Sequence, residues 1–268
     1  MGFFSWLFKR NKPQPKKLGL ALGSGGAKGY AELGVLRAFE ENGVEFSVVA
    51  GTSIGSIIGA FYADGYSSTD ILELLNQVDF SNVLTGIPIN MDTSGIIKVI
   101  EDNLGEKNIE DLKKPFQTVA THLESGKEKV FSRGNLSVAL ASSSCMPPFF
   151  KPVVIDRQRY IDGAYVNSIP ADLVKQMGAD YIVGVDLSLS DNKTEGLSKL
   201  FPTYKAKVEN PKEQGYKYSN VVLRPNLKGF SSISIKRGKE MFDIGYQTAI
   251  EQMPKILADI KALNNKKG

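Results

Sequence analysis

Apolar and polar positions follow two periods along this chain. Short apolar runs that end at glycine or at a polar residue are typical of buried strands, and stretches with apolar residues three and four apart are typical of helices. The runs predict strands over residues 18–22, 46–50, 116–121, 129–131, 153–155, 159–161, 181–187 and 221–223. The helical spacings predict helices over residues 30–41, 54–63, 69–77, 95–104, 136–142, 170–178 and 236–263, the last of them interrupted or kinked at Pro254. This alternation predicts an α/β fold with a mostly parallel central sheet sandwiched between helices.

Two segments depart from this pattern. Residues 1–16 are predicted to form a basic and aromatic membrane-surface tail and linker, and residues 17–268 to form a single domain. With 268 residues, 42% of them apolar, the chain is long enough to bury one large core. Residues 189–217 are rich in lysine, glutamate and asparagine, and we expect them to form a polar surface excursion of that domain.

The tail combines large apolar side chains with cations. Its members are Phe3, Phe4, Trp6, Leu7 and Phe8, followed by Lys9 and Arg10. The apolar run is too short to span a bilayer, which takes about 20 residues, and its charges follow it rather than precede it as in a secretory signal. In a helix one side would carry Phe3, Phe4, Leu7 and Phe8 and the opposite side Lys9 and Lys12, as in an interfacial anchor. We therefore expect a cytoplasmic protein that associates peripherally with the inner face of the membrane.

Charge and rare residues exclude several classes of function. The net charge is +4, but residues 1–17 hold five cations and no acid, so the rest of the chain is not basic and nucleic acid is not an expected partner. The chain has one cysteine, Cys145, and one histidine, His122, which excludes disulfide frameworks and histidine-rich zinc sites. We expect neither a metal ion nor an organic cofactor.

The strongest local motif is G-x-S-x-G at Gly51, Ser53 and Gly55, between an apolar strand and an apolar helix. This context is that of a nucleophile elbow. The glycines allow a tight turn, and the serine hydroxyl then lies at a helix N-terminus, where the dipole favours a developing anion. We interpret Ser53 as a nucleophile rather than as part of a purely structural glycine turn.

A second glycine-rich segment, Gly23–Gly29, directly follows the first predicted strand. Such a run can form a nest of backbone N–H groups that holds an anion. The spacing G-x-x-x-x-G-K-[ST] of phosphate loops is absent, so a nucleotide site is not favoured. An oxyanion hole requires the same backbone donors.

A serine nucleophile also needs a base. His122 follows a predicted strand, and Asp162 ends a short strand beside Gly163, where its side chain can face a cleft. Asp186 also ends a strand, but acids in this place often cap the next segment. From the residues alone, both His122 and Asp162 remain candidates.

Three motifs in this order resemble the patatin-like phospholipase family in its short bacterial form: Gly23–Gly29, Gly51–Gly55, and Asp162-Gly163-Ala164. The resemblance extends from about Lys17 to Leu187 and implies a patatin-like three-layer architecture. It also implies a Ser-Asp dyad, with Ser53 as nucleophile and Asp162 as base and proton acceptor. The implied oxyanion hole is formed by Gly25, Gly26 and Ala27, with Lys28 as a possible anion contact. His122 stands where many relatives carry aspartate, which leaves a pairing of Ser53 with His122 open.

The resemblance implies a serine acyl hydrolase of lipid esters, of phospholipase A or lysophospholipase type, that works through an acyl-enzyme. Its expected partners are a phospholipid or other lipid ester and a membrane surface. A thioesterase or acyltransferase would use the same dyad. The alternative from another class is a catalytically silent lipid-binding or regulatory module that keeps the fold.

Overall fold

The computed structural model describes residues 16–77, 91–188 and 210–265. One sheet extends through them in the strand order β5-β6-β3-β2-β1-β7-β8, and β4 also pairs with β3. The strands are β1 (Leu18–Leu22), β2 (Val48–Thr52), β3 (Phe116–His122), β4 (Glu128–Phe131), β5 (Val153–Ile155), β6 (Gln158–Asp162), β7 (Tyr181–Val185) and β8 (Val221–Leu223). The neighbouring strands β3, β2, β1, β7 and β8 are parallel to one another. Strands β4, β5 and β6 run antiparallel to their neighbours.

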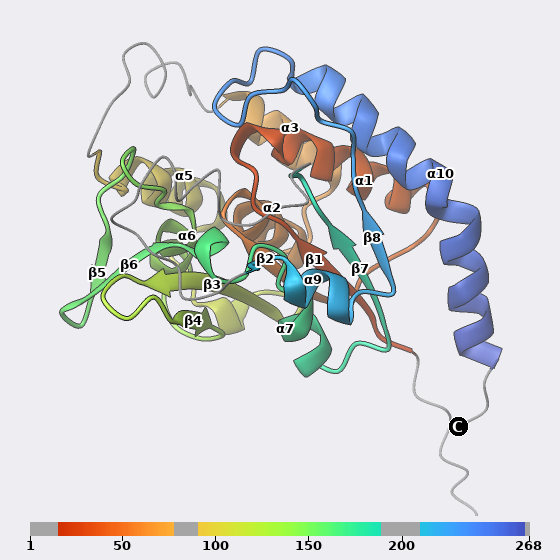
Figure 1. Cartoon of the computed structure of the whole chain (residues 1–268), viewed down its shortest axis with the longest axis horizontal. Coiled ribbons are helices and arrows are strands. Elements are labelled where there is room, and N and C mark those ends of the chain that lie inside the picture. Colours follow the sequence, from red (N-terminus) through yellow and green to blue (C-terminus); the bar gives the residue numbers. More distant parts are fainter. Residues whose placement is uncertain (1–15, 78–90, 189–209, 266–268) are drawn as a thin grey trace, which may run out of the picture.

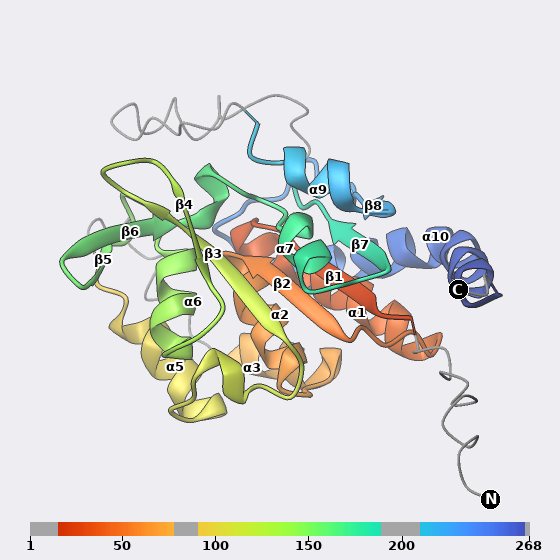
Figure 2. The ribbon, with the colours of Figure 1, turned by 90° about the horizontal axis from the view of Figure 1, so that it is seen from below.

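Helices cover both faces of the sheet (Figure 1). They are α1 (Tyr30–Glu41), α2 (Ile54–Ala63), α3 (Ser68–Gln77), α5 (Ser94–Leu104), α6 (Leu136–Ser144), α7 (Ala171–Gln176), α9 (Glu213–Tyr218) and α10 (Gly238–Asn265). Short 3₁₀ turns are η1 (Gly26–Gly29), η2 (Ile109–Asp111) and η3 (Gly163–Tyr165). Figure 2 shows α7 lying over β1 and β2, on the opposite face from α1. The predicted α/β class, with a central sheet between helices, is confirmed.

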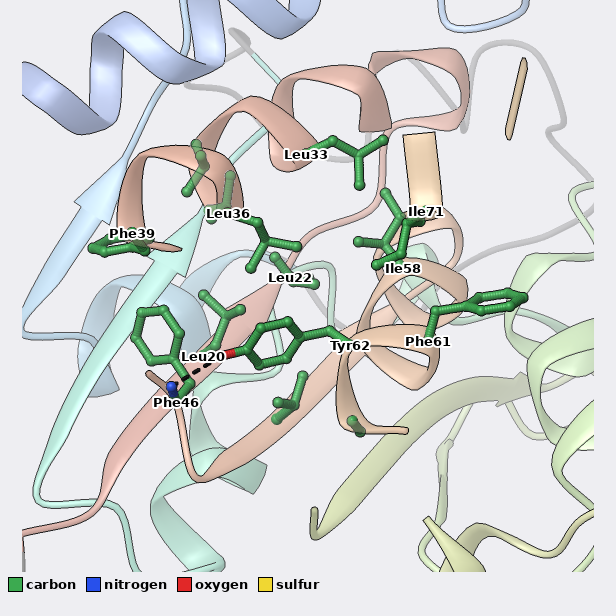
Figure 3. Packing of buried hydrophobic residues seen from close by; sticks show 14 of the residues in the cluster. Leu20, Leu22, Leu33, Leu36, Phe39, Phe46, Ile58, Phe61, Tyr62 and Ile71 are labelled. Carbon is green, nitrogen blue, oxygen red and sulfur yellow. Dashed lines mark hydrogen bonds between the residues drawn. The ribbon is translucent and has the colours of Figure 1, made fainter. Parts of the chain in front are cut away.

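The alternation of side chains along β1 divides the core in two. Leu20 and Leu22 point to the face covered by α1, α2 and α3, whereas Ala21 points to the face covered by α7. Figure 3 shows the first cluster, in which the ring of Phe46 packs between Phe39 and Tyr62. Both faces of the strand are therefore apolar, which explains the continuous apolar run in the sequence.

Two expected elements differ in the structure. The predicted strand over residues 46–50 begins later, at Val48, because Phe46 donates its N–H to the Tyr62 hydroxyl (3.0 Å) instead of joining the sheet. Helix α10 continues through Pro254 without interruption. Pro254 lies on the exposed side of the helix, and burial of Met253 and Ile256 on the other side holds the helix against the core.

Residues 189–217, predicted as a polar surface excursion, are described only from residue 210 onwards. There the chain forms α9, which packs on α7 and β7. Gly215 is buried so closely that a Cβ atom there would lie 2.6 Å from Cβ of Ile169. The short helix looked like loop in the sequence because so few of its positions face the core.

The register around β3 brings two distant strands together. Thr118 and Val119 pair with β2 on one side and with β4 on the other, and Ala120 and Thr121 pair with β4 and β6. Since β4 occupies one edge throughout, β2 and β6 must share the other edge. They run toward each other, with Thr52 beside Val119 and Asp162 beside Ala120. The residue after β2 and the last residue of β6 therefore meet.

Helix α10 crosses α1 at very short range. A Cβ atom at Gly245 would lie 1.9 Å from the carbonyl oxygen of Ala31, and one at Gly34 would lie 2.0 Å from the carbonyl oxygen of Phe242. No side chain fits at either position without moving the helices apart. The two glycines thus fix the helix that closes this side of the core.

We expect Gly245→Ala to destabilise the protein by about 1–3 kcal/mol, because the added methyl group forces α10 away from α1. The matched control is Gly95→Ala in α5, where a Cβ atom would meet nothing within 4 Å. Its stability should change by less than about 1 kcal/mol. Urea unfolding of both variants measures the difference, and an equal response would contradict the packing argument.

Candidate active site

Ser53 occupies a strained turn between β2 and α2. Its backbone angles are φ 56° and ψ −126°, in a region that residues with a Cβ atom rarely adopt. A Cβ atom at Gly51 would lie 2.1 Å from the carbonyl oxygen of Gly55, so only glycine fits there. A Cβ atom at Gly55 would approach the backbone of Leu22 to 2.6 Å. Both glycines of the G-x-S-x-G motif are therefore required by close backbone contacts.

Three hydrogen bonds hold this turn in place. The N–H of Ser53 donates to Oγ of Ser143 in α6 (2.9 Å), and Oγ of Ser56 donates to the carbonyl oxygen of Ser53 (2.6 Å). One residue earlier, Oγ1 of Thr52 donates to the carbonyl oxygen of Asn167 (2.8 Å). A strained backbone costs about 1–3 kcal/mol and persists only where its surroundings fix it. Ser143 was not identified from the sequence, because nothing distinguishes it within the run Ser142–Ser144.

Asp162 accepts a hydrogen bond from the Ser53 hydroxyl. The distance between Oγ of Ser53 and Oδ2 of Asp162 is 2.7 Å, and Oδ1 of Asp162 accepts the N–H of Ala164 (2.8 Å). The backbone N–H of Asp162 donates to the carbonyl oxygen of Cys145 (3.1 Å), which fixes the end of β6. The structure thus brings together the two residues that the resemblance pairs as nucleophile and base.

Burial changes the acidity of this carboxyl group. Asp162 is fully buried, and the loss of solvation raises its pKa to about 7, although the hydrogen bonds from Ala164 and Ser53 act in the opposite direction. A carboxylate with this pKa is a much stronger base than an exposed aspartate. It can accept a proton from a hydroxyl group near neutral pH.

The glycine-rich segment packs against the elbow. The N–H of Gly23 donates to Oε1 of Glu32 (2.7 Å), and that of Ser24 donates to the carbonyl oxygen of Ser168 (3.0 Å). Within the described residues, the N–H groups of Gly25 and Gly26 have no hydrogen-bond partner. These two groups can therefore receive an anion.

Ala27 differs from the expectation for the oxyanion hole. Its N–H donates to the carbonyl oxygen of Ser232 in the loop after β8 (2.8 Å). A Cβ atom at Gly26, whose φ is +57°, would lie 2.2 Å from the same oxygen. Because its donor is already used, Ala27 is corrected from an oxyanion donor to an anchor of the glycine-rich segment.

Glu32 is a buried acid beneath this segment. It is fully inaccessible, its Oε2 atom has no hydrogen-bond partner among the residues that the structure describes, and burial raises its pKa well above the usual range. In the sequence it lies three, four and seven positions before the apolar residues Val35, Leu36 and Phe39, on the same helix face. An acid on an otherwise apolar helix face is the sequence pattern that could have predicted a buried carboxyl group holding the glycine-rich segment.

Lys28 lies in a half-buried position near Asp186. Its pKa is lowered by burial, an effect that the charge of Asp186 opposes and that of Lys212 reinforces. Asp186 itself accepts hydrogen bonds from Nζ of Lys212 (3.0 Å), from the Tyr216 hydroxyl (2.7 Å) and from the N–H of Ser188 (3.0 Å). Asp186 therefore organises the chain after β7, as expected of an acid that ends a strand.

His122 does not pair with Ser53. Its ring contacts Oγ of Ser125 (2.7 Å), Oε1 of Gln158 (2.6 Å) and Oε2 of Glu124 (3.3 Å). The Ser53 hydroxyl instead bonds to Asp162. The Ser53–His122 alternative left open by the sequence is therefore wrong in this geometry.

Within residues 16–77, 91–188 and 210–265, no three His, Cys, Asp or Glu side chains are grouped so that they could hold a metal ion. None of the helices described there is both long and apolar enough to cross a bilayer. The predicted tail residues, from Phe3 to Arg10, lie outside the described residues.

A family model described as patatin-like phospholipase matches residues 20–175, which include the glycine-rich segment, the elbow and Asp162. The chain belongs to the patatin-like phospholipase family. Patatin-like phospholipase domain-containing protein 6 of Homo sapiens is 29% identical over 279 residues, covering 86% of this chain and 20% of the relative. An uncharacterized NTE family protein of Mycobacterium tuberculosis is 32% identical, over 65% of this chain and 50% of the relative. The chain thus spans half or less of these relatives.

Two solved structures share the fold. VipD from Legionella pneumophila matches with a TM-score of 0.62 and 13% identity, over 90% of this chain and 67% of that chain. Human GIVD cytosolic phospholipase A2 matches with a TM-score of 0.55 and 11% identity, over 92% of this chain and 60% of that chain. At such low identity these likenesses concern the fold of this patatin-like chain and not its activity.

If the Asp162 carboxylate activates Ser53, the rate of labelling of Ser53 by a soluble fluorophosphonate should depend on pH. Only the deprotonated form accepts the proton. The rate should therefore rise with pH, reach a plateau above the Asp162 pKa of about 7, and fall about tenfold per unit below it. Stopped samples analysed by mass spectrometry give the profile. His122→Ala should show the same midpoint, and a midpoint lost with His122 would contradict this assignment.

Proposed function

We propose that this chain is a serine acyl hydrolase of lipid esters, of phospholipase A or lysophospholipase type. The observation that carries the proposal is the 2.7 Å hydrogen bond from the Ser53 hydroxyl to a buried Asp162, at the end of two strands of a patatin-like domain. The description of the matching family model and the name of the human relative support a lipid ester as the substrate class.

The geometry supports a two-step reaction. Oγ of Ser53 attacks the ester carbonyl as Asp162 takes the hydroxyl proton, and the N–H groups of Gly25 and Gly26 hold the developing oxyanion. Collapse of the tetrahedral intermediate breaks the ester bond, and Asp162 returns the proton to the leaving alcohol. In the second step Asp162 takes a proton from water, which attacks the acyl-enzyme. Collapse of the second tetrahedral intermediate breaks the bond between Oγ of Ser53 and the acyl carbon. Asp162 returns its proton to Oγ, and the fatty acid leaves.

The raised pKa of Asp162 fits both halves of this cycle. A carboxyl group that titrates near neutral pH can take a proton from the serine and give it back to an alcohol without being trapped in either form. Glu32 and Ser143 would contribute by position: the first fixes the start of the glycine-rich segment, and the second fixes the Ser53 backbone. Neither needs to exchange a proton with the substrate.

The tail is the proposed membrane contact. The rings of Phe3, Phe4 and Trp6 would enter the interface, while Lys9 and Arg10 would approach anionic headgroups at the inner face of the membrane. Such an anchor would raise the local concentration of lipid substrate around the dyad.

Ser53→Ala and Asp162→Asn should each lower fatty-acid release by at least about 10³-fold, because each removes one partner of the proton transfer. Release is measured by mass spectrometry from vesicles of phospholipid, lysophospholipid and neutral lipid. His122→Ala is the control and should keep most of the activity. If wild type releases no fatty acid from any of these vesicles, lipid hydrolysis is excluded, and transfer to an added alcohol or thiol acceptor tests the acyltransferase alternative.

Deleting residues 2–12 should weaken binding to anionic vesicles, because it removes five large apolar side chains and three cations. Co-sedimentation with vesicles measures the binding, and hydrolysis of a soluble short-chain ester shows that the domain remains intact. Unchanged sedimentation would contradict the role of the tail.

A further inference from the structure

The loop between β8 and α10, residues 224–237, is unusually basic. We call it the basic loop. Its fourteen residues include no acid and four cations, Arg224, Lys228, Lys236 and Arg237, of which Arg237 pairs with Glu240 of α10. In the part of the chain that the structure describes, Lys228 and Lys236 are exposed and form no ion pair. Their charges are therefore available to an anionic partner.

The basic loop also exposes an apolar side chain at a defined place. Leu227 is fully buried, and Phe230 and Ile235 pack against the core, so the loop is anchored from inside. The guanidinium group of Arg237 covers the ring of Phe230 at 3.9 Å. Ile233, by contrast, is 54% exposed between these anchors.

This exposed residue lies next to the candidate oxyanion hole. Ser232, which immediately precedes Ile233, accepts the N–H of Ala27 (2.8 Å) and closely contacts Gly26. The basic loop therefore borders the donors that would face the scissile ester. In Figure 1 it lies at the top of the molecule, where the chain enters α10.

We propose that the basic loop is a docking surface for an anionic lipid bilayer, with Ile233 inserted at the interface and Lys228 and Lys236 against headgroup phosphates. This proposal rests on the proposed lipid hydrolase function. An apolar tip beside unpaired lysines suits an interface that is apolar inside and negatively charged outside. Docking in this orientation would bring the bilayer to the oxyanion side of the site.

Other occupants fit less well. A specific protein interface needs about 800 Å² per partner with an apolar centre, whereas this loop exposes one large aliphatic side chain. Single-stranded nucleic acid is bound by stacking on exposed aromatic rings, and the one ring of the loop, Phe230, is covered by Arg237. The charge and the apolar tip together favour a lipid surface.

The test compares two double variants of the full-length chain. Ile233→Asp with Lys236→Glu changes the basic loop. The matched control, Leu257→Asp with Lys261→Glu, makes the same changes of type on α10, where Leu257 is 40% exposed. Leu257 lies about 28 Å along the helix from Gly238, well beyond the Debye length of about 10 Å. Figure 1 shows this end of α10 pointing away from the basic loop.

Binding is measured by co-sedimentation with vesicles of phosphatidylcholine, with and without phosphatidylglycerol. The tail and the loop belong to one chain, so their contributions to the vesicle association constant multiply. A loss of the loop's contribution therefore lowers the measured affinity even when the tail still binds. The loop variant should bind anionic vesicles about tenfold more weakly than wild type or worse, and the control should bind as wild type. High salt should reduce the difference.

The proposal is overturned by equal effects of the two double variants, by an unchanged affinity of the loop variant, or by wild-type binding that does not depend on phosphatidylglycerol. Binding of the loop to an RNA oligonucleotide or to a protein in place of vesicles would also overturn it. Hydrolysis of a soluble short-chain ester separates this test from the proposed function. A loop variant that keeps esterase activity and loses vesicle binding supports docking. If the wild-type protein has no esterase activity, that result counts against the proposed hydrolase function and not against docking. If the charged variant unfolds, Ile233→Ser with Lys236→Ser replaces it.

Discussion

Two strands that run toward each other along one edge of β3 create the site. Strand β2 ends at Thr52 and β6 ends at Asp162, and the pairing of both with β3 leaves their ends in contact. The hydrogen bond from Ser53 to Asp162 is thus fixed by backbone pairing rather than by the choice of side-chain rotamers alone. The same pairing places the 3₁₀ turn η3 (Gly163–Tyr165) directly after β6, against the end of β2. A Cβ atom at Gly163 would lie 2.3 Å from the carbonyl oxygen of Val119. A residue larger than glycine would push the two ends apart.

Burial of the dyad has an energetic cost that the rest of the fold offsets. The pKa of Asp162 is raised from 3.8 to about 7. Between these two pH values the carboxyl group is protonated in the folded protein and deprotonated in the unfolded chain. Stability contributed by this group is fully present below pH 4 and is lost as the pH rises through 7. A shift of this size corresponds to about 4 kcal/mol. The large apolar cluster around Leu20, Phe39 and Ile58 supplies the compensating burial.

The sequence predicted the parts of this site that depend on local pattern. The apolar run before Gly51 and the apolar helix after Ser53 predicted the turn that the structure forms at Ser53. The family resemblance added Asp162 as the expected base, and the structure places its carboxyl group at the Ser53 hydroxyl. Features that depend on long-range contacts were missed. The donor of Ala27 is occupied by Ser232, which follows β8, and Ser143 reaches Ser53 from α6. The hydrophobic periodicity of the sequence does not predict these contacts, because they form only once the sheet order and the helix packing are set.

The positive φ angle of Ser53 has a consequence for how this chain can change. Glycine adopts such a conformation at less cost than serine, and the positions on either side already require glycine. The substitution that relaxes this turn most directly, serine to glycine, is therefore also one that removes the proposed nucleophile. Selection for stability alone would act against the hydroxyl group at this position.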